Sequence, residues 1–219
     1  MPVEDRDFIK INYTGRFEDG TVFDTTDEEI AKESDIYDEN ARYEPFIVIV
    51  GAKHVVEGLD EDFIGKDIGY HGTIKVPPEK CYGERKPELI TTHPTTRFKE
   101  KLSKGMRVSI DGKEGTVVMT IGRKVRIDFN NPMAGETLIF DYTIEDIIDE
   151  DLEKIRYLLK SNFATDFDVK IDDGNVLIES PHILLFNERW LVLKERLAQE
   201  LLQSLDIESV KFVETYKGS

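Results

Sequence analysis

The residues best suited to chemistry in this sequence are aromatic side chains and one acid at the ends of apolar segments. They are Tyr13, Phe23, Asp24, Phe46, Tyr82 and Phe140. Gathered by a sheet, these side chains would line an apolar cavity with hydroxyls and a carboxylate at its edge. The sequence offers no Ser-His-Asp arrangement, no Gly-rich phosphate loop and no paired carboxylates, so neither an activated nucleophile nor a phosphate site is expected.

Metal and cofactor chemistry is not expected either. The chain has one cysteine, Cys81, and four scattered histidines, which leaves no Cys-paired zinc site, no metal-ligand spacing and no internal disulfide framework. We interpret Cys81 as a small buried residue rather than a reactive thiol. The site is therefore predicted to work without a cofactor.

The composition indicates a soluble globular protein. The net charge of −16 argues against nucleic acid as a partner, because phosphate binding needs a basic surface. The longest apolar run, Phe46–Val50, is far shorter than the roughly 20 residues that span a bilayer, and the first residues lack the pattern of a secretory signal. We expect a cytoplasmic protein whose partners include neither nucleic acid nor a membrane.

Strand and turn signals dominate the N-terminal part. Residues 7–17 alternate in the manner of a strand, and the Asp-Gly pair at 19–20 predicts a hairpin to a second strand at 21–24. Residues 46–50 are typical of a strand buried on both faces, and residues 72–76 of a strand ended by two prolines. These segments are expected to form one sheet.

A short helix is predicted after the strand at 46–50. Its apolar residues at helical spacing are Val55, Val56, Leu59 and Phe63. Residues 25–44, by contrast, are polar and acidic and favour a long loop, or a bulged segment with a helical turn.

A basic block interrupts the acidic body. Residues 86–128, called the insert below, hold 10 Lys and Arg against five Asp and Glu, which favours a unit with its own surface. The stretch between Pro87 and Pro94 is interpreted as connection, and three short strands are predicted after it. Residues 137–147 then alternate so strongly that they predict a long strand returning to close the interrupted sheet.

The remaining residues, 149–219, are called the C-terminal unit. An amphipathic helix at 152–163 precedes a hairpin with an Asp-Asp-Gly turn at 172–174, and a second helix and a last strand follow. The expected order is α-β-β-α-β. A small core and an open sheet edge favour a homodimer formed through this unit.

The order of the short motifs resembles that of the FKBP-type peptidyl-prolyl cis-trans isomerases. The shared elements are Tyr-x-Gly at 13–15, Asp-Gly-x-x-Phe-Asp at 19–24, the Pro-Phe strand at 45–51, Val-Val-x-Gly at 55–58, Tyr-Gly at 82–83 and Leu-x-Phe at 138–140. The insert lies where the SlyD-like subgroup of this family carries its insert-in-flap chaperone domain.

The resemblance implies an α+β fold. An antiparallel FKBP half-barrel sheet with a short helix would be interrupted by a small all-β insert and followed by a separate α-β-β-α-β domain. The implied FKBP-type prolyl isomerase domain comprises residues 1–85 and 129–148, the insert-in-flap chaperone domain residues 86–128, and the C-terminal α/β domain residues 149–219. We recognise no family for the last of these.

The resemblance also implies the site residues. The catalytic residues would be Tyr13, Asp24, Tyr82 and Phe140, and the substrate-binding residues Phe23, Phe46, Val55, Val56 and Leu59. In the family, the backbone N–H at the Val56 position and the hydroxyl at the Tyr82 position hold substrate carbonyls. Leu59 stands where many members have Trp, so tight macrolide binding is not expected. The His-rich tail of some SlyD-type proteins is absent, and nickel binding is not implied.

Prolyl isomerisation needs no nucleophile. Rotation about an amide bond meets a barrier of about 18–20 kcal/mol, because twisting destroys amide resonance. The planar amide is more polar than the twisted one, so an apolar cavity favours the twisted state while oriented donors fix the flanking carbonyls. The predicted function is therefore a prolyl isomerase that also captures unfolded, proline-containing polypeptides on the insert.

Two other functions stay open at this point. The FKBP fold could serve as a non-catalytic chaperone or binding module, or as an assembly scaffold whose C-terminal unit selects the partner. Taken singly, Tyr13, Phe46 and Phe140 are better explained as core residues of strands, and only the ordered series favours a pocket. The combination of Tyr82, Phe140 and Asp24 favours catalysis.

Overall fold

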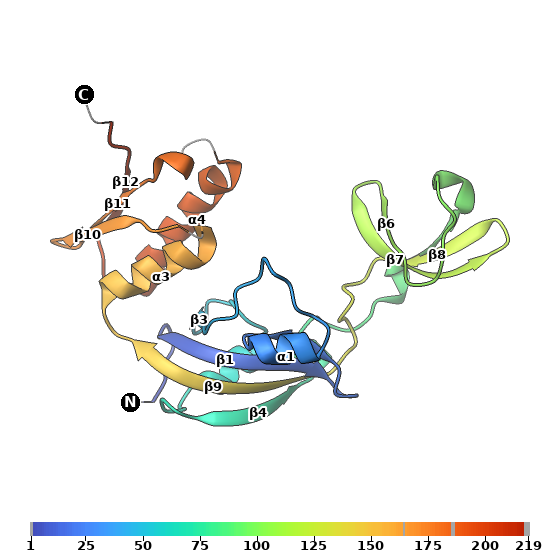
Figure 1. The fold of residues 1–219 in the computed structure, drawn as a ribbon, viewed down its shortest axis with the longest axis horizontal. Helices are drawn as coiled ribbons and strands as arrows, with labels where there is room; N and C mark the ends of the chain where they lie inside the picture. Colours follow the sequence, from blue (N-terminus) through green and yellow to red (C-terminus); the bar gives the residue numbers. More distant parts are fainter. Residues whose placement is uncertain (1, 164, 185–186, 217–219) are drawn as a thin grey trace.

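The computed structural model describes residues 2–163, 165–184 and 187–216. Within these ranges, four α-helices and three sheets make a mixed α+β protein, and every strand pair is antiparallel except β11 with β12. Figure 1 shows the N-terminal sheet with the insert beyond one end and the C-terminal unit beyond the other.

The N-terminal sheet is built around its first and last strands. Its members are β1 (Phe8–Phe17), β2 (Val22–Thr25), β3 (Phe46–Ile49), β4 (His71–Val76) and β9 (Leu138–Ile148). The order is β2-β1-β9-β4, and β3 pairs with β1 as well. β1 and β9 pair along their whole length, from Phe8 with Ile148 to Phe17 with Leu138. The strand that was expected to return after the insert therefore closes this sheet.

Two short helices accompany the N-terminal sheet. Helix α1 (Glu28–Glu33) is capped by the carboxylate of Asp27 and lies in the segment expected to be a long loop or a bulge with a helical turn. Helix α2 (Glu57–Phe63) begins later than predicted, because Val56 has an extended backbone and stands at the N-cap. Both valines of the predicted helix therefore belong to the loop before it.

The insert is a four-stranded sheet in the order β5-β8-β7-β6. Its strands are β5 (Ile90–Pro94), β6 (Arg107–Ile110), β7 (Lys113–Ile121) and β8 (Lys124–Asp128). The prediction that the stretch between Pro87 and Pro94 is only connection was wrong, because β5 occupies most of it. β5 is an edge strand, where a proline removes no essential ladder hydrogen bond and the threonines suit a pleated surface.

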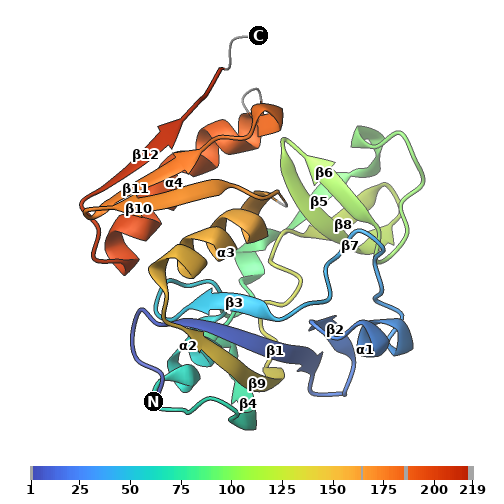
Figure 2. The same cartoon turned by 60° about the vertical axis from the view of Figure 1, so that its left-hand side comes forward.

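The C-terminal unit contains two helices and a three-stranded sheet ordered β10-β11-β12. Its elements are α3 (Asp151–Phe163), β10 (Asp168–Asp172), β11 (Asn175–Glu179), α4 (Glu188–Ser204) and β12 (Ser209–Val213). Single 3-10 turns occur in the chain at Pro78–Lys80, Pro87–Leu89, Thr95–Arg97 and His182–Leu184. In Figure 2, α3 lies between the strands of this unit and β3.

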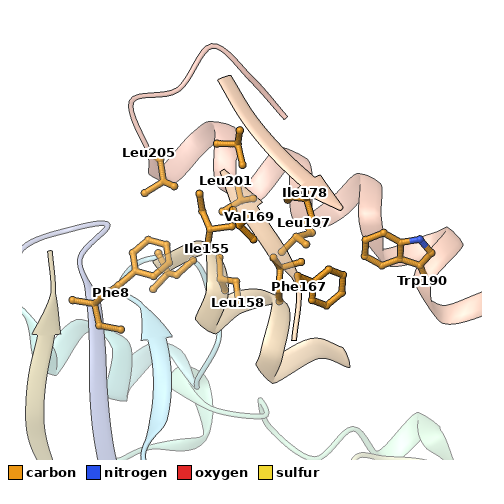
Figure 3. Close-up of a cluster of buried hydrophobic side chains, with 14 of the residues drawn as sticks. Phe8, Ile155, Leu158, Phe167, Val169, Ile178, Trp190, Leu197, Leu201 and Leu205 are labelled. Carbon is orange, nitrogen blue, oxygen red and sulfur yellow. The ribbon is translucent and has the colours of Figure 1, made fainter. Parts of the chain in front are cut away.

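The core of the C-terminal unit continues into the N-terminal sheet. Phe8, Ile49 and Ile148 of that sheet are buried in one cluster with Ile155 and Leu158 of α3. Figure 3 shows Phe8, Ile155 and Leu158 of this cluster. Only residues 149–150 separate β9 from α3, so the helix is held close to the sheet from which the chain emerges. The C-terminal unit is therefore packed against the sheet through a shared apolar core.

Candidate functional site

Three neighbouring strands bring the predicted aromatic side chains together. Tyr13 on β1, Phe23 on β2 and Phe140 on β9 form the group, with ring centroids 6.4 Å apart for Tyr13 and Phe140 and 5.9 Å apart for Phe23 and Phe140. Phe46, at the start of β3, adds its ring at 6.3 Å from that of Tyr13. Pairing of β2, β3 and β9 with β1 thus creates an aromatic surface at one place on the sheet.

A glycine makes this aromatic packing possible. A Cβ atom added to Gly15 would lie 2.5 Å from the Phe23 ring and 3.2 Å from the Phe140 ring. Real side chains do not approach so closely, so the third residue of the Tyr-x-Gly motif must be small for the two phenyl rings to meet over β1. The packing of these two rings therefore explains the glycine of this motif.

Tyr13 is held by the acid that follows Phe23. Its hydroxyl donates a hydrogen bond of 2.7 Å to the carboxylate of Asp24, which is otherwise exposed. Burial, and then this hydrogen bond, raise the pKa of Tyr13 well above its ordinary value of 10.0. Tyr13 is therefore a neutral hydroxyl, and its hydrogen bond to Asp24 fixes the direction of its proton.

Tyr82 stands on the turn that precedes the insert. Its side chain is 42% exposed, and burial of the rest of the ring is the main cause that raises the pKa of Tyr82. Gly83 has a φ of +76° and donates a 2.7 Å hydrogen bond to the Pro78 carbonyl, which fixes the turn. The Tyr82 hydroxyl is thus a neutral donor open to solvent.

Cys81 does not behave as a reactive thiol. Burial raises its pKa to about 11, so the thiol is protonated at neutral pH. The side chain packs against the core of the N-terminal sheet. The interpretation as a small packing residue agrees with this environment.

The loop before α2 offers a free backbone donor. Within the described residues, no acceptor is found for the N–H of Val56, whose carbonyl accepts the first hydrogen bonds of the helix. Val55 and Val56 pack against the same apolar core as Phe23 and are partly exposed. An unpaired N–H at a helix N-terminus is well placed to bind a carbonyl oxygen.

The predicted site residues either line one of two cavities or lie in the buried core. Tyr13, Phe23, Asp24 and Phe46 line a cavity of about 550 Å³, called the Tyr13 cavity below. Val55, Val56 and Tyr82 line another, of about 620 Å³. Phe140 and Leu59 line neither, since they are 5% and 1% exposed, and belong to the core of the N-terminal sheet.

Some residues of the Tyr13 cavity were missed by sequence reasoning. They are Lys10, Arg42, Tyr43, Tyr157 and Lys160 among others. Tyr43 lies in a segment interpreted only as a polar loop, and Tyr157 and Lys160 belong to the C-terminal unit. No local pattern connects that unit with β1, so only the folded arrangement reveals the contact.

Among the described residues, no group of three or more His, Cys, Asp or Glu side chains could hold a metal ion. None of the described helices is long and apolar enough to cross a membrane.

A family comparison decides what this arrangement belongs to. The model of the FKBP-type peptidyl-prolyl cis-trans isomerases matches residues 1–141. The chain is a member of the FKBP family. A second model, described as FKBP26_C-terminal, matches residues 151–217, a match that motif reading did not find. The FKBP-type isomerase assignment made from the motifs is confirmed.

Curated relatives carry the same family name. The short-type peptidyl-prolyl cis-trans isomerase of Methanocaldococcus jannaschii is 35% identical over 144 residues, which are 64% of this chain and 91% of that protein. The FKBP-type peptidyl-prolyl cis-trans isomerase SlyD of Helicobacter pylori is 32% identical over 117 residues, or 51% of this chain and 63% of that protein. SlyD of Aeromonas hydrophila is 28% identical, covering 67% and 65%. The SlyD-like relationship is thus also confirmed.

Proposed function

We propose that this FKBP-type isomerase rotates Xaa-Pro bonds over the aromatic surface of Tyr13, Phe23, Phe46 and Phe140. The observation that carries the proposal is the combination of that apolar surface with a hydroxyl held by Asp24 and an unpaired N–H at Val56. These groups surround a bound amide with apolar contacts and hold its flanking carbonyls. They supply no nucleophile, and the reaction needs none.

The aromatic residues and the hydrogen-bond donors have different roles in this proposal. Phe140, with Leu59 in the same core, supports the aromatic surface from below. In this proposal Phe23 and Phe46 contact the proline ring. Removing water from the prolyl amide costs the polar planar state more than the less polar twisted state. The Val56 N–H and the Tyr82 hydroxyl bind the carbonyls on either side of the rotating bond, and Tyr13 is kept in place by Asp24.

The energies required are modest. Each tenfold acceleration needs about 1.4 kcal/mol less barrier, and one well-placed donor in a transition state supplies about 2.7–4 kcal/mol. Desolvation together with two oriented donors is therefore sufficient for a large acceleration. The roles of Tyr82 and Val56 follow from their free hydroxyl and N–H.

The insert supplies a second activity in this proposal. We assign residues 1–85 and 129–148 to the isomerase domain, 86–128 to a chaperone domain and 149–219 to a C-terminal domain. On β7, Met119 and Ile121 are 42% and 68% exposed. Exposed apolar side chains on a basic unit suit the capture of unfolded segments, and the flexible side chain of Met suits varied partners.

The decisive experiment for the isomerase is a refolding assay. A protein whose slow refolding phase is limited by proline isomerisation is refolded with catalytic amounts of the full chain. We expect the slow phase, which takes roughly 10–100 s unaided, to shorten in proportion to enzyme concentration. An unchanged slow phase together with reduced aggregation would favour the alternative of a non-catalytic chaperone or binding module.

We also propose a homodimer formed through the C-terminal domain. Ile183, Leu191 and Val192 are 80%, 50% and 72% exposed around the start of α4, and a second copy would cover them. We expect light scattering to give twice the mass of one chain at micromolar concentration, and Val192→Glu to halve it. A monomeric mass for the unaltered chain would contradict this.

The proposed location is the cytoplasm. The single cysteine suits its reducing environment.

A further inference from the structure

One wall of the Tyr13 cavity comes from the C-terminal unit. Tyr157 and Lys160 of α3 line this cavity together with Tyr13 and Phe46 of the N-terminal sheet. The two residues are three positions apart, so they share one face of the helix. The shared core described above takes other side chains of α3, including Leu158. Tyr157 also packs against this core, so it links the core to the cavity, whereas Lys160 is exposed.

Contacts with the sheet hold this wall in place. The Lys10 ammonium lies 4.8 Å from the centre of the Tyr157 ring and 3.5 Å from the Asp146 carboxylate. The Tyr157 side chain is also the main cause of a raised pKa of Lys10, although burial opposes it. Farther along the interface, His54 Nε2 and the Glu200 carboxylate are 2.6 Å apart. The wall is thus preformed, and binding does not have to order it.

The charges around the Tyr13 cavity are mostly engaged already. Asp24 accepts from Tyr13, Asp38 accepts from the Asn40 backbone and side chain, and Arg42 and Glu44 are 3.6 Å apart. The remaining basic residues of the wall are Lys10, which pairs with Asp146, and Lys160. Lys160 is exposed and has no ion-pair partner among the described residues. A carboxylate entering the cavity would therefore find an available ammonium group at Lys160.

We infer that Tyr157 and Lys160 extend the proline site into a longer groove that selects polypeptides with an acidic residue close to the Xaa-Pro bond. The inference rests on the proposed role of the Tyr13 surface in binding proline. Substrate bound there continues directly into the volume bounded by α3, because Tyr13 and Phe46 line the same cavity as Lys160. Tyr157 gives the chain beside the proline an aromatic contact, and Lys160 gives an acidic side chain an ion pair.

The test compares peptides that differ only in charge near the proline. Glu, Lys or Ala is placed in turn at each of the positions flanking the Xaa-Pro bond, and kcat/KM for isomerisation is measured with the full chain. At one or more of these positions we expect Glu to exceed Lys by about three- to fivefold at low salt, as for a solvent-exposed ion pair. The Glu-to-Lys ratio of kcat/KM should fall toward one in about 1 M salt, where the screening length is about 3 Å.

Lys160→Glu then assigns the effect to α3. We expect this exposed substitution to invert the Glu-to-Lys ratio, and kcat/KM on the all-Ala peptides reports any general loss of activity. Lys170→Glu on β10 is the matched control: it makes the same change in net charge at an exposed position that does not line the cavity, and should leave the ratio unchanged.

Three outcomes would overturn the inference. If Lys160→Glu leaves the Glu-to-Lys ratio of kcat/KM unchanged, Lys160 does not cause the preference. If Lys160→Glu and Lys170→Glu shift this ratio equally, the effect comes from net charge alone. An unaltered chain that isomerises none of the peptides, including those with Ala, overturns the proposed function and the inference with it. The first two results leave the isomerase proposal intact, because activity on the Ala peptides is measured in the same experiment.

Discussion

Replacing Tyr82 by alanine is expected to lower kcat/KM for isomerisation of a short Xaa-Pro peptide by at least about tenfold, which corresponds to about 1.4 kcal/mol of barrier. The side chain is 42% exposed and stands on a turn fixed by backbone hydrogen bonds of Gly83, so the fold does not depend on it. We therefore expect the melting temperature to change little. Isomerisation rates from NMR exchange and a thermal melt measure the two quantities separately.

Two further variants sharpen this prediction. Tyr82→Phe keeps the ring and removes the donor, so it should lose most of the activity if the hydroxyl binds a carbonyl. Tyr216→Ala, at a tyrosine that is 71% exposed on the C-terminal unit, serves as the control and should keep full activity. Full activity in Tyr82→Ala would show that this residue is not part of the catalytic site.

Phe140 is less useful as a probe, although it was predicted as a catalytic residue. Its side chain is 5% exposed and lies between the rings of Tyr13 and Phe23. Truncating a buried phenylalanine to alanine costs about 3–5 kcal/mol of stability. A loss of activity in Phe140→Ala would therefore combine a damaged site with a weakened fold, which is why Tyr82 is the better choice.

Removal of the insert is expected to separate catalysis on peptides from catalysis on proteins. We propose a variant in which residues 87–127 are replaced by a short Gly-Ser turn. It should keep most of its kcat/KM on a short peptide, since the Tyr13 surface and the Val56 donor lie outside the insert. It should lose about tenfold or more in prolyl-limited refolding of a protein, because capture on the insert supplies an effective concentration on the order of millimolar.

The boundaries of this replacement follow from the junction of the two sheets. Arg85 Nε donates a 2.7 Å hydrogen bond to the nearly buried Asp128 carboxylate, and the Lys86 N–H donates to the Asn130 side chain at 2.9 Å. Retaining residues 85–86 and 128–130 preserves these contacts. The matched control is Met119→Ser with Ile121→Ser in the complete chain, which should reproduce the refolding defect. Equal losses on peptide and protein would show that the insert is structural.

The sequence predicted elements well where local pattern and tertiary environment agree. Alternation identified the long strand β9, and the hairpin expected at the Asp-Asp-Gly turn is formed by β10 and β11. The start of α2 was placed too early because Val55 and Val56 fit a helical period while packing from a loop. The strand at Phe46–Ile49 was expected to be buried on both faces, yet Phe46 is 38% exposed beside the cavity.

The site was predictable only in part. Its aromatic surface follows from family motifs that lie on paired strands, and the structure brings Tyr13, Phe23 and Phe140 together. The wall formed by Tyr157 and Lys160 depends on how α3 packs on β3 and β1, a contact between segments far apart in sequence. No periodicity or spacing encodes such a contact, since it arises from the burial of a shared core.

The pairing of β1 with β9 also determines when each part of the molecule can fold. The four strands of the insert pair only with one another, whereas Phe8 must wait for Ile148 before the N-terminal sheet closes. A ribosome adds about 5–20 residues per second, and pairing of distant segments is slow because the loop between them must first be closed. The insert can therefore fold while β1 and β4 still lack their common partner β9. If the insert captures unfolded segments as proposed, a nascent chain of this protein would display that surface beside its own unfinished sheet and would be its first client.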